Sequence, residues 1–501
     1  MAAAGVRARC GCASARRALY WRHPTGRQAM TTTHAAAGDA PLHDPGSGPP
    51  VAALVGQGLP VPCLDGVRRP YADLDAAAST SALPAVAERV ADVLPWYSSV
   101  HRGAGHKSQL ATAAYERARA DILAFAGRDP DRDTAILCRN TTEAVNHLAH
   151  RLRLDPADVV VSTAVEHHAN LLPWARVATR RFVECGLEGT FDLAAVVAAL
   201  DARPAARLLA VTGASNITGW LPPVGAMIAE AHARGVPVLV DGAQRAPHLP
   251  LPPEADFVAF SGHKMYAPYG AGALIGPRDA FADGEPFLAG GGAVEFVSLD
   301  EVIWTSPPER EEAGSPNVLG ALALGTAAAE LPALGWDRIA AHDRALAQRL
   351  RGGLAAIGGV RLLGPGLEVA TLPIATFLIE GVPHALAAAR LSAEFGVGVR
   401  HGCFCAHPYL QRLLGLDAAG TRRFRDAAVD RDRRGRPGAV RASAGIATTI
   451  QDVDRLLEGV AAVASGPPPV EYLRDAGTGE AWPAGFPRPA EPGRGGSGES
   501  S

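Results

Sequence analysis

Short apolar runs rich in β-branched residues alternate with alanine-rich stretches through the middle of the chain. Runs that are apolar throughout are typical of strands buried on both faces of a sheet. We interpret four of them as such strands: Val159–Val161, Leu208–Val211, Val236–Val240 and Phe257–Phe260. Between two of these strands, Val224–Arg234 predicts a helix that ends at Gly235. This alternation predicts an α/β fold with a largely parallel sheet.

The pattern becomes more helical after about Asn317. Ile339, Leu346, Leu350 and Leu354 fall on one face of a helix with about 3.6 residues per turn. We therefore expect a long helix that leads into a second, smaller domain. The chain then divides into four expected parts: a disordered leader over 1–50, an N-terminal segment and large domain over 51–325, a small C-terminal domain with a cysteine loop over 326–464, and a disordered tail over 465–501.

Two segments of the expected small domain depart from its helical pattern. Gly396–Pro408 gathers glycine, arginine, histidine and cysteine into one loop. Residues 421–438 are a charged excursion in which Asp426, Asp430 and Asp432 interrupt the arginines. Because the two signs alternate, we predict that this excursion is a solvated loop rather than a binding patch.

Composition narrows the class of protein. The chain has 501 residues, 48% of them hydrophobic and 20% charged, and its net charge of −3 gives no reason to expect a nucleic-acid partner. Its seven cysteines are scattered and odd in number, which favours a reducing compartment such as the cytoplasm over a disulfide scaffold. The uncharged stretch Ala313–Ala329 is shorter than the ~20 apolar residues that a membrane span needs.

The expected leader has an unusual charge balance. Its first 38 residues contain six arginines and no acid, which is one property of a transit peptide. Because the stretch has no clear amphipathic face, we prefer to interpret it as leader sequence that precedes a true start at Met30.

A lysine follows the last of the four predicted strands. Phe257–Phe260 runs directly into Ser261-Gly262-His263-Lys264, and in parallel sheets ligands bind beyond the carboxyl ends of the strands. A desolvated lysine loses its proton more readily and becomes a Schiff-base nucleophile, and the serine and histidine beside it can donate hydrogen bonds to a phosphate. The alternative is a polar turn with a surface lysine.

An aspartate follows the preceding strand. Val236–Val240 ends in Asp241-Gly242-Ala243-Gln244. A buried carboxylate is costly without a partner, and a protonated pyridine nitrogen is such a partner, because the ion pair makes the ring an electron sink. Gln244 could then reach a hydroxyl on the ring. The alternative is an aspartate that caps a helix N-terminus.

Two further motifs complete a candidate cofactor site. Arg139–Glu143 opens a helical stretch, where threonine hydroxyls and free backbone N–H groups would bind a phosphate unless the threonine is an ordinary cap. Glu166–Asn170 contains His167 and His168, but a metal site lacks a third ligand at suitable spacing, so an imidazole stacked on an aromatic ring is the better interpretation. Together the four motifs supply the contacts that pyridoxal 5′-phosphate (PLP) needs.

Ten motifs occur in a fixed order within residues 65–464. They are Asp73–Ser79, Val100–Gly103, Asn140–Asn146, Glu166–Asn170, Ser215-Asn216, Asp241–Gln244, Ser261–Lys264, Gly314–Asn317, Arg400 to Cys405, and Arg441–Ser443. In this order they resemble the class V aminotransferase family, and within it the SufS-like cysteine desulfurases and selenocysteine lyases. The resemblance implies a PLP-dependent transferase of fold type I, with a large, mostly parallel domain and a smaller C-terminal α/β domain. It also implies a homodimer with active sites at the subunit interface.

The resemblance assigns roles to residues at matching positions. Lys264 would hold PLP as a Schiff base and later move the α-proton of the substrate. Asp241 would pair with the pyridine nitrogen, Gln244 would contact the ring oxygen, and His167 would stack on the ring. Asn216 would lie near the cofactor oxygen and the substrate. The phosphate would be bound by Thr141, Thr142, Ser261 and His263, with Ser315 contributed by the other subunit.

Four residues are assigned to the substrate. Arg441 would bind the substrate carboxylate, since a planar guanidinium suits bidentate contact with it. Arg400 would belong to the same substrate site, and His101 and Arg102 would line its entrance.

A cysteine loop decides which reaction is expected. In the desulfurases a loop cysteine followed by Ala-x-Pro attacks the sulfur of the bound cysteine and keeps it as a persulfide, and Cys405–Pro408 matches that segment. We expect Arg400, His401 and His407 to favour the reactive thiolate of Cys405. The alternative is a structural cysteine in a turn.

The chain departs from the family immediately before Cys405. Cys403-Phe404 occupies positions where the family often has paired histidines. Cys403 either resolves a persulfide on Cys405, forms a disulfide with it, or simply packs.

The leading hypothesis is a PLP-dependent cysteine desulfurase that converts L-cysteine to L-alanine, forms a persulfide on Cys405, and passes sulfur to an acceptor protein. One alternative is a related C–S lyase, or a selenocysteine lyase, that needs no persulfide. Another is a non-catalytic binding protein on the same fold, against which the intact Lys264, Asp241 and His167 argue.

Overall fold

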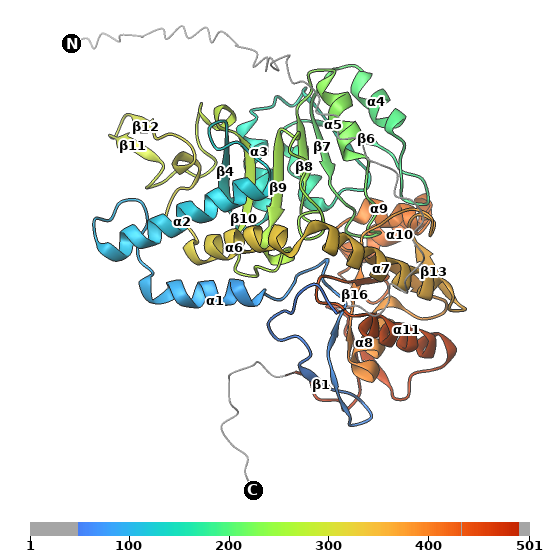
Figure 1. Cartoon of the computed structure of the whole chain (residues 1–501). Coiled ribbons are helices and arrows are strands. Elements are labelled where there is room, and N and C mark those ends of the chain that lie inside the picture. The colour runs from blue at the N-terminus through green and yellow to red at the C-terminus, as the bar shows by residue number, and fades with distance from the viewer. Residues whose placement is uncertain (1–48, 432, 490–501) are drawn as a thin grey trace, which may run out of the picture. The chain divides into compact units, whose positions relative to one another are not determined.

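Seven strands make up the central sheet of the structure, a computed structural model that describes residues 49–489 with the exception of residue 432 (Figure 1). Their spatial order is β4 (Asp133–Cys138), β10 (Gly272–Pro277), β9 (Phe257–Ser261), β8 (Val238–Asp241), β7 (Ala206–Thr212), β5 (Val159–Thr163) and β6 (Thr179–Val183). Neighbours from β9 to β6 run parallel, while β10 is antiparallel to β9 and β4. The predicted α/β fold is confirmed, and β5, β7, β8 and β9 are the four predicted strands.

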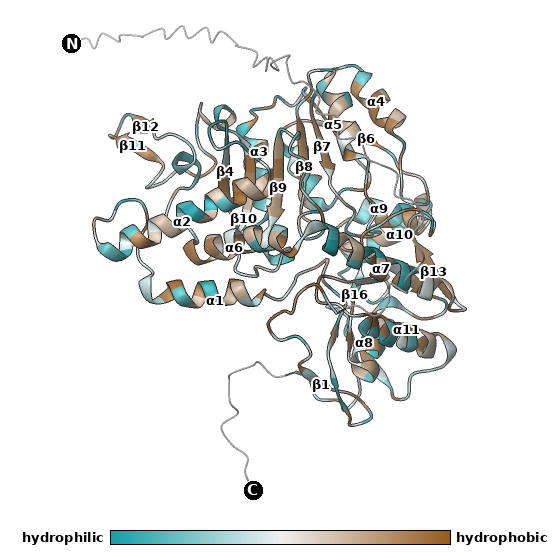
Figure 2. Cartoon of the chain, viewed as in Figure 1, coloured by the Kyte–Doolittle hydropathy of each residue, from teal (hydrophilic) through white to brown (hydrophobic). Residues whose placement is uncertain are grey.

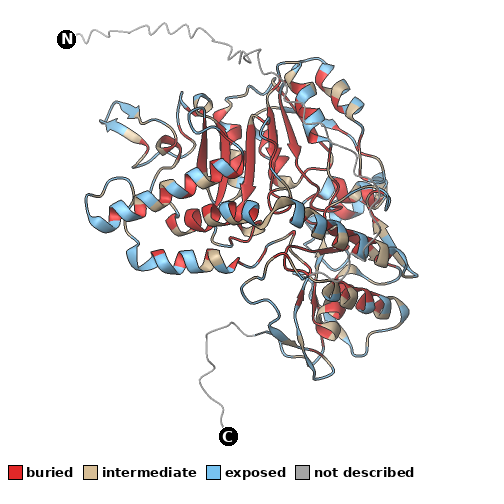
Figure 3. Cartoon of the chain, in the orientation of Figure 1, coloured by how far each residue is buried: buried red, intermediate tan, exposed pale blue. Residues whose placement is uncertain are grey.

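Helices cover both faces of this sheet, which is why its inner strands are largely apolar, whereas the edge strand β6 is polar and partly exposed (Figures 2 and 3). They are α1 (Pro84–Val93), α2 (His106–Phe125), α3 (Thr141–Arg151), α4 (Leu193–Asp201), α5 (Val224–His232) and α6 (Val318–Leu334). Successive residues of a strand face opposite sides. In β7, Leu209 and Val211 therefore join the core formed with α2, α5 and α6, whereas Leu208 and Ala210 join the core formed with α3. The helix predicted before Gly235 is α5.

A second, four-stranded antiparallel sheet forms the C-terminal part. Its spatial order is β13 (Val360–Leu363), β14 (Ile374–Ile379), β17 (Ala439–Ser443) and β16 (Arg400–Gly402). Its apolar core includes residues of α7 (Trp336–Ala355), α8 (His384–Phe395) and α11 (Ile450–Ser465). The predicted long helix is α7, which buries all four of the residues that predicted it.

The N-terminal segment packs with this second sheet. β3 (Ala72–Asp73) pairs in parallel with β15 (Val397–Gly398), and Ala72 and Leu74 belong to the C-terminal core. Sequence analysis grouped this segment with the large domain, because only the distant pairing partner reveals its place. The other two-stranded pairs are β1 (Pro60–Pro62) with β2 (Arg68–Pro70), and β11 (Val294–Val297) with β12 (Val302–Trp304).

Three segments expected to be irregular contain regular structure. The 421–438 excursion includes most of α10 (Ala418–Val429), whose Phe424 is buried, so the loop prediction is wrong there. Within the expected tail, β18 (Tyr472–Arg474) pairs with β19 (Ala481–Pro483), which contradicts disorder over 466–489. The cysteine segment contains β15 and β16, and α9 (His407–Leu413) begins after its turn. Residues 1–48 of the predicted leader and 490–501 of the tail lie outside the described residues.

Helix α6 lies against α2 at close range. A Cβ atom added to Gly325 of α6 would lie 2.7 Å from both Cα and Cβ of Ala118. Glycine at this position therefore lets the two helices approach.

Within the described part of the chain, no single helix is long and apolar enough to cross a bilayer. Helices α6 and α7 meet the requirements of length and composition only when they are taken together, and they are bent by 83° relative to each other.

We predict that Gly325→Val lowers the free energy of unfolding by about 1–3 kcal/mol, because the added side chain overpacks the contact between α2 and α6. Gly352→Ala in α7 is the control, since no atom lies within 4 Å of the added Cβ. The control should raise stability by about 0.5–1 kcal/mol through helix propensity. Urea unfolding followed by circular dichroism measures both changes, and equal stability of Gly325→Val and wild type would contradict the packing.

Candidate active site

A cavity of about 240 Å³ lies beyond the carboxyl ends of β5, β8 and β9. This is where a parallel sheet is expected to bind its ligand. Twelve of the predicted site residues line it: Thr141, Thr142, His167, Asn216, Asp241, Gln244, Ser261, His263, Lys264, Arg400, Cys405 and Arg441. The structure thus brings together residues that are up to 300 positions apart in the sequence, from Thr141 to Arg441.

Lys264 ends a short 3₁₀ turn, Gly262–Lys264, that follows β9. The turn is tight, since a Cβ on Gly262 would lie 2.9 Å from the carbonyl oxygen of Ala267. Burial lowers the pKa of Lys264 to about 8, although the nearby carboxylate of Asp241 opposes the shift. The amine therefore loses its proton closer to neutral pH than an ordinary lysine does, which favours its role as a Schiff-base nucleophile.

Asp241 is the last residue of β8 and is almost completely buried. Its Oδ1 accepts a hydrogen bond from the backbone N–H of Ala243 (3.0 Å), and Oδ2 has no partner among the described residues. Burial raises its pKa, while Lys264 opposes this. A cationic ring nitrogen beside Oδ2 would supply the missing partner, so the carboxylate fits the pyridine end of PLP.

His167 forms another wall of the cavity. Its Nδ1 accepts a hydrogen bond from the backbone N–H of Ala169 (3.0 Å), which fixes the ring and leaves the proton on Nε2. Burial lowers its pKa to about 3, and the charge of Lys264 adds to the shift. The imidazole is therefore neutral and held in place, which suits stacking on an aromatic ring better than proton transfer.

The start of α3 fits a phosphate group. Asn140 caps the helix by accepting a hydrogen bond from the N–H of Glu143 (3.0 Å), which excludes the alternative of an ordinary threonine cap and leaves the threonine hydroxyls for other partners. The N–H of Thr141 donates to Oγ of Ser261 (2.8 Å), and the two hydroxyls lie 2.7 Å apart. Gly272 permits this approach, because a Cβ there would lie 2.8 Å from Cα of Asn140. Hydroxyls at a helix N-terminus suit a phosphate.

Two arginines share one carboxylate that sequence analysis missed. Nη2 of Arg441 lies 3.1 Å from Oδ1 of Asp75, and Nε of Arg400 lies 3.0 Å from Oδ2. Burial lowers the pKa of Arg441 to about 10, which still leaves it cationic at neutral pH. Asp75 lies within a motif that the resemblance used, but only the pairing of the two sheets reveals its partners. It orients both guanidinium groups where a substrate carboxylate would bind.

Cys405 lies in a tight turn with strained backbone. The carbonyl oxygen of Cys403 accepts a hydrogen bond from the N–H of Ala406 (3.1 Å), and Phe404 and Cys405 have φ of 53° and 52°. Left-handed backbone is unfavourable for residues other than glycine, by about 1–2 kcal/mol each. Such strain persists only where surrounding contacts enforce it.

Side chains of the large domain enforce this turn. The side-chain amide of Asn216 donates to the carbonyl oxygen of Phe404 (2.8 Å). The backbone N–H of His168 donates to the carbonyl oxygen of Cys405 (2.8 Å). The N–H of His407 donates to Nε2 of His168 (3.1 Å). Asn216 lines the cavity, as the resemblance implied, and its contact with the cysteine turn could not be predicted from the sequence. These hydrogen bonds hold Cys405, which is exposed, at the edge of the cavity with Lys264.

The two thiols of the loop have different surroundings. Sγ of Cys403 donates to the carbonyl oxygen of Pro437 (3.3 Å), and burial raises its pKa to about 11, so it is a protonated thiol. Cys403 and Cys405 are both free, and this favours packing over a disulfide for Cys403.

The expected thiolate environment needs a correction. Burial lowers the pKa of His401 to about 4, and it also lowers the pKa of His407. Both rings are therefore neutral near pH 7, so neither supplies the positive charge that was expected beside Cys405. The cationic side chains that line the same cavity as Cys405 are Lys264, Arg400 and Arg441.

His101, Arg102 and Ser315 lie elsewhere. They line a separate cavity of about 970 Å³, together with Gly292 and Val294. Within one chain, these three predicted residues are therefore not part of the Lys264 cavity.

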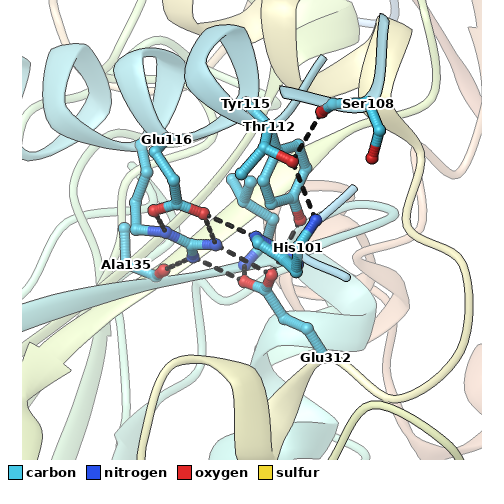
Figure 4. Close-up of polar contacts among 9 residues, drawn as sticks. His101, Ser108, Thr112, Tyr115, Glu116, Ala135 and Glu312 are labelled. Atoms are coloured by element: carbon cyan, nitrogen blue, oxygen red, sulfur yellow. Dashed lines mark hydrogen bonds and ion pairs between the residues drawn. The ribbon is translucent and has the colours of Figure 1, made fainter. Parts of the chain in front are cut away.

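A polar network supports this second cavity (Figure 4). The carboxylate of Glu312 accepts hydrogen bonds from Arg119 (2.7 and 3.0 Å) and from the hydroxyl of Tyr115 (2.7 Å). Arg119 also contacts Glu116, whose Oε1 lies 2.8 Å from Nε2 of His101. The network joins α2 to the segment that carries Ser315, so both walls of the second cavity are fixed relative to each other.

Comparisons with known proteins identify the class. The model of the aminotransferase class V family matches residues 73–456, and the chain belongs to this family. A cysteine desulfurase of Dickeya dadantii is 36% identical over 405 residues, which cover 78% of this chain and 92% of that protein. The cysteine desulfurase CsdA of Escherichia coli is 33% identical with a TM-score of 0.65, covering 78% and 94% of the two chains. The apo cysteine desulfurase of Thermococcus onnurineus is 30% identical with a TM-score of 0.69, covering 79% and 95%.

PLP is the cofactor of this family, and the cavity fits it. Four groups surround this one space: a buried carboxylate, a partly unprotonated lysine, a neutral imidazole and the hydroxyl-rich start of a helix. Among residues 49–431 and 433–489, no group of three or more histidine, cysteine or acidic side chains is placed to hold a metal ion.

We predict that covalent attachment of PLP to the cofactor-free protein speeds up as pH rises through about 8, because only the unprotonated amine of Lys264 attacks the aldehyde. Asp241 raises the pKa of Lys264, so Asp241→Asn should move the midpoint to lower pH. Asp300→Asn changes an exposed aspartate outside the cavity and should leave the midpoint unchanged. Reductive trapping followed by peptide mass spectrometry measures the rate, and an unchanged midpoint in Asp241→Asn would contradict the pairing.

Proposed function

We propose that the chain is a cysteine desulfurase that converts L-cysteine to L-alanine and keeps the sulfur as a persulfide on Cys405. The observation that carries this proposal is that Cys405 and Lys264 line one cavity, with the thiol exposed and its backbone fixed. The cysteine desulfurases that resemble the chain support the same reaction.

The cavity residues divide the work. Arg441 and Arg400, oriented by Asp75, bind the substrate carboxylate. When bound, PLP accepts the electron pair left when the α-proton is removed, and Asp241 stabilises the positive charge of its ring. Lys264 has a pKa of about 8, so it can take that proton and return it within one cycle.

Cys405 performs the sulfur step. Its thiolate attacks the sulfur of the substrate, a new S–S bond forms, and the bond between carbon and sulfur breaks. The electron pair of the broken bond stays with carbon, which gains a proton and leaves as alanine. Lys264 and Arg441 line the same cavity as this thiol.

The alternative is a C–S or selenocysteine lyase that needs no persulfide. Such an enzyme would have no use for an exposed thiol in the cavity wall, nor for the strained turn that holds it. The desulfurase is therefore favoured. Its proposed compartment is the cytoplasm, because the five cysteines among the described residues are all free.

We predict that Cys405→Ala lowers alanine formation from L-cysteine by about 10²-fold or more, because no nucleophile remains to accept the sulfur. Cys403→Ala should stay within about threefold of wild type, because its protonated thiol points to Pro437. Alanine assays and the added mass of one sulfur atom on the Cys405 peptide give the result. Unchanged alanine release in Cys405→Ala would rule out the persulfide step.

A homodimer completes the proposal. The hairpin of β11 and β12 projects from the rest of the chain (Figure 1) and exposes apolar side chains, which are Phe296, Val297, Leu299, Val302 and Ile303. Exposed apolar patches of this kind mark interaction sites. The hairpin belongs to the same segment as Ser315, so packing against a second copy would bring Ser315, His101 and Arg102 to the site of the partner subunit.

We predict that Phe296→Asp with Ile303→Asp converts the dimer to a monomer, because charges on the buried face of an interface are costly. Leu367→Asp is the matched control, since Leu367 is 55% exposed and Ile303 is 49% exposed. Light scattering coupled to gel filtration reports the mass. Dimers in both variants would exclude the hairpin as the interface.

A further inference from the structure

A groove of about 720 Å³ lies beside the second sheet, outside the Lys264 cavity. It is lined by the start of β13, the end of β14, His384 of α8 and residues 434–438. Its basic residues are Arg361, Arg434, Arg436 and Arg474, and its acid is Glu380. We call it the arginine groove.

Charges that alternate in the sequence are separated in space. Asp426 lies in α10 and Asp430 directly after it, and neither lines the groove. Arg425 pairs with Asp426 at 3.5 Å, also outside it. Arg434 and Arg436 instead face Arg361 and Arg474, which come from other elements. Residues 434–436 form an irregular and mostly exposed segment, as predicted, and both of its arginines line the groove.

Three cations of the groove, Arg361, Arg436 and Arg474, have no carboxylate partner among the described residues. Arg361 has no ion pair or hydrogen bond among the described residues. Arg436 and Arg474 donate to backbone carbonyl oxygens, and the Nε–H of each is buried without a partner in the described part of the chain. Burial of a guanidinium without a carboxylate is unfavourable, and an added carboxylate would relieve it.

The rest of the lining is apolar. Val360, Leu378, Val382 and Pro437 contribute side chains without charge. A free phosphate would use only the arginines, whereas an extended acidic segment that also carries an apolar side chain would use both parts of the lining.

The groove is hydrogen-bonded to the cysteine loop. The carbonyl oxygen of Pro437 accepts a hydrogen bond from Sγ of Cys403 (3.3 Å). The carbonyl oxygen of Arg436 lies 3.1 Å from Nε2 of His384, and this nitrogen must be the donor because a carbonyl oxygen only accepts. Burial lowers the pKa of His384, so the ring is neutral and its Nδ1 accepts from Nδ1 of His401 (3.2 Å). One wall of the groove thus contacts both the turn that holds Cys405 and the strand before it.

We propose that the arginine groove binds an acidic segment of a partner protein, and that this partner accepts sulfur from Cys405. The positive charge and the partly apolar lining of the groove support an acidic segment as its ligand. The hydrogen bonds between the groove and the cysteine loop support a partner that accepts sulfur, and this second part of the proposal rests on the proposed function. Bound there, the segment is coupled through Pro437 and Arg436 to the turn that presents the thiol.

The binding test uses the full chain and a fluorescein-labelled peptide of alternating glutamate and leucine. Fluorescence anisotropy at low salt should detect binding, and Arg361→Glu and Arg474→Gln should each weaken it about fivefold or more. Arg425→Glu, an exposed arginine outside the groove, should change it by less than about twofold. A lysine–leucine peptide should not bind.

Three outcomes of the binding test overturn the proposal. One is an absence of peptide binding, and another is equal weakening by Arg425→Glu. The third is full displacement of the peptide by inorganic phosphate at the peptide's own concentration, which would make the groove a phosphate site. Light scattering of Arg361→Glu adds a check, because a changed particle mass would make a second copy of the chain the occupant and would also overturn the proposal.

A second measurement tests the coupling without catalysis. The rate at which iodoacetamide alkylates Cys405, followed by mass spectrometry, should change by about twofold or more when the peptide binds wild type, and should not change in Arg361→Glu. An unchanged rate in wild type would overturn the link to the loop. Neither measurement depends on alanine formation, so failure of the proposed reaction is distinguishable from failure of the groove.

Discussion

The site depends on a carboxylate and an amine buried at the ends of neighbouring parallel strands. Asp241 ends β8 and Lys264 follows β9, so the sheet itself fixes their relation. Each is costly to bury as an ion, and each shifts the pKa of the other toward its charged form. The pair leaves space between the strand ends for a ring whose nitrogen is cationic, and the neutral imidazole of His167 and the start of α3 enclose that space.

The cysteine loop adds reaction specificity to this cofactor site. Phe404 and Cys405 have backbone that favours glycine, and contacts from Asn216 and His168 of the large domain hold it. The thiol is thus presented by a strained turn fixed from outside its own sheet.

Local patterns predicted what depends on neighbours in sequence. The four buried strands, the long helix and the positions of Asp241 and Lys264 after their strands could be predicted, because period and strand ends are local properties. The role of Asp75 and the neutrality of His401 could not be predicted from the sequence, because both depend on contacts with distant segments of the chain. In α10, charge alternation hid a buried Phe424. The C-terminal hairpin is a local pairing in a segment rich in proline and glycine, and its contact with α8 is not visible in the sequence.

The most direct test of the central claim is the protonation state of the cofactor ring. Loading the protein with PLP labelled with ¹⁵N in the pyridine ring permits its measurement by NMR at neutral pH. A protonated nitrogen in wild type that becomes unprotonated in Asp241→Asn is the result that the buried carboxylate predicts. An unprotonated nitrogen in wild type would contradict the account, because Asp241 would then lack the cation for which its position at the end of β8 is suited.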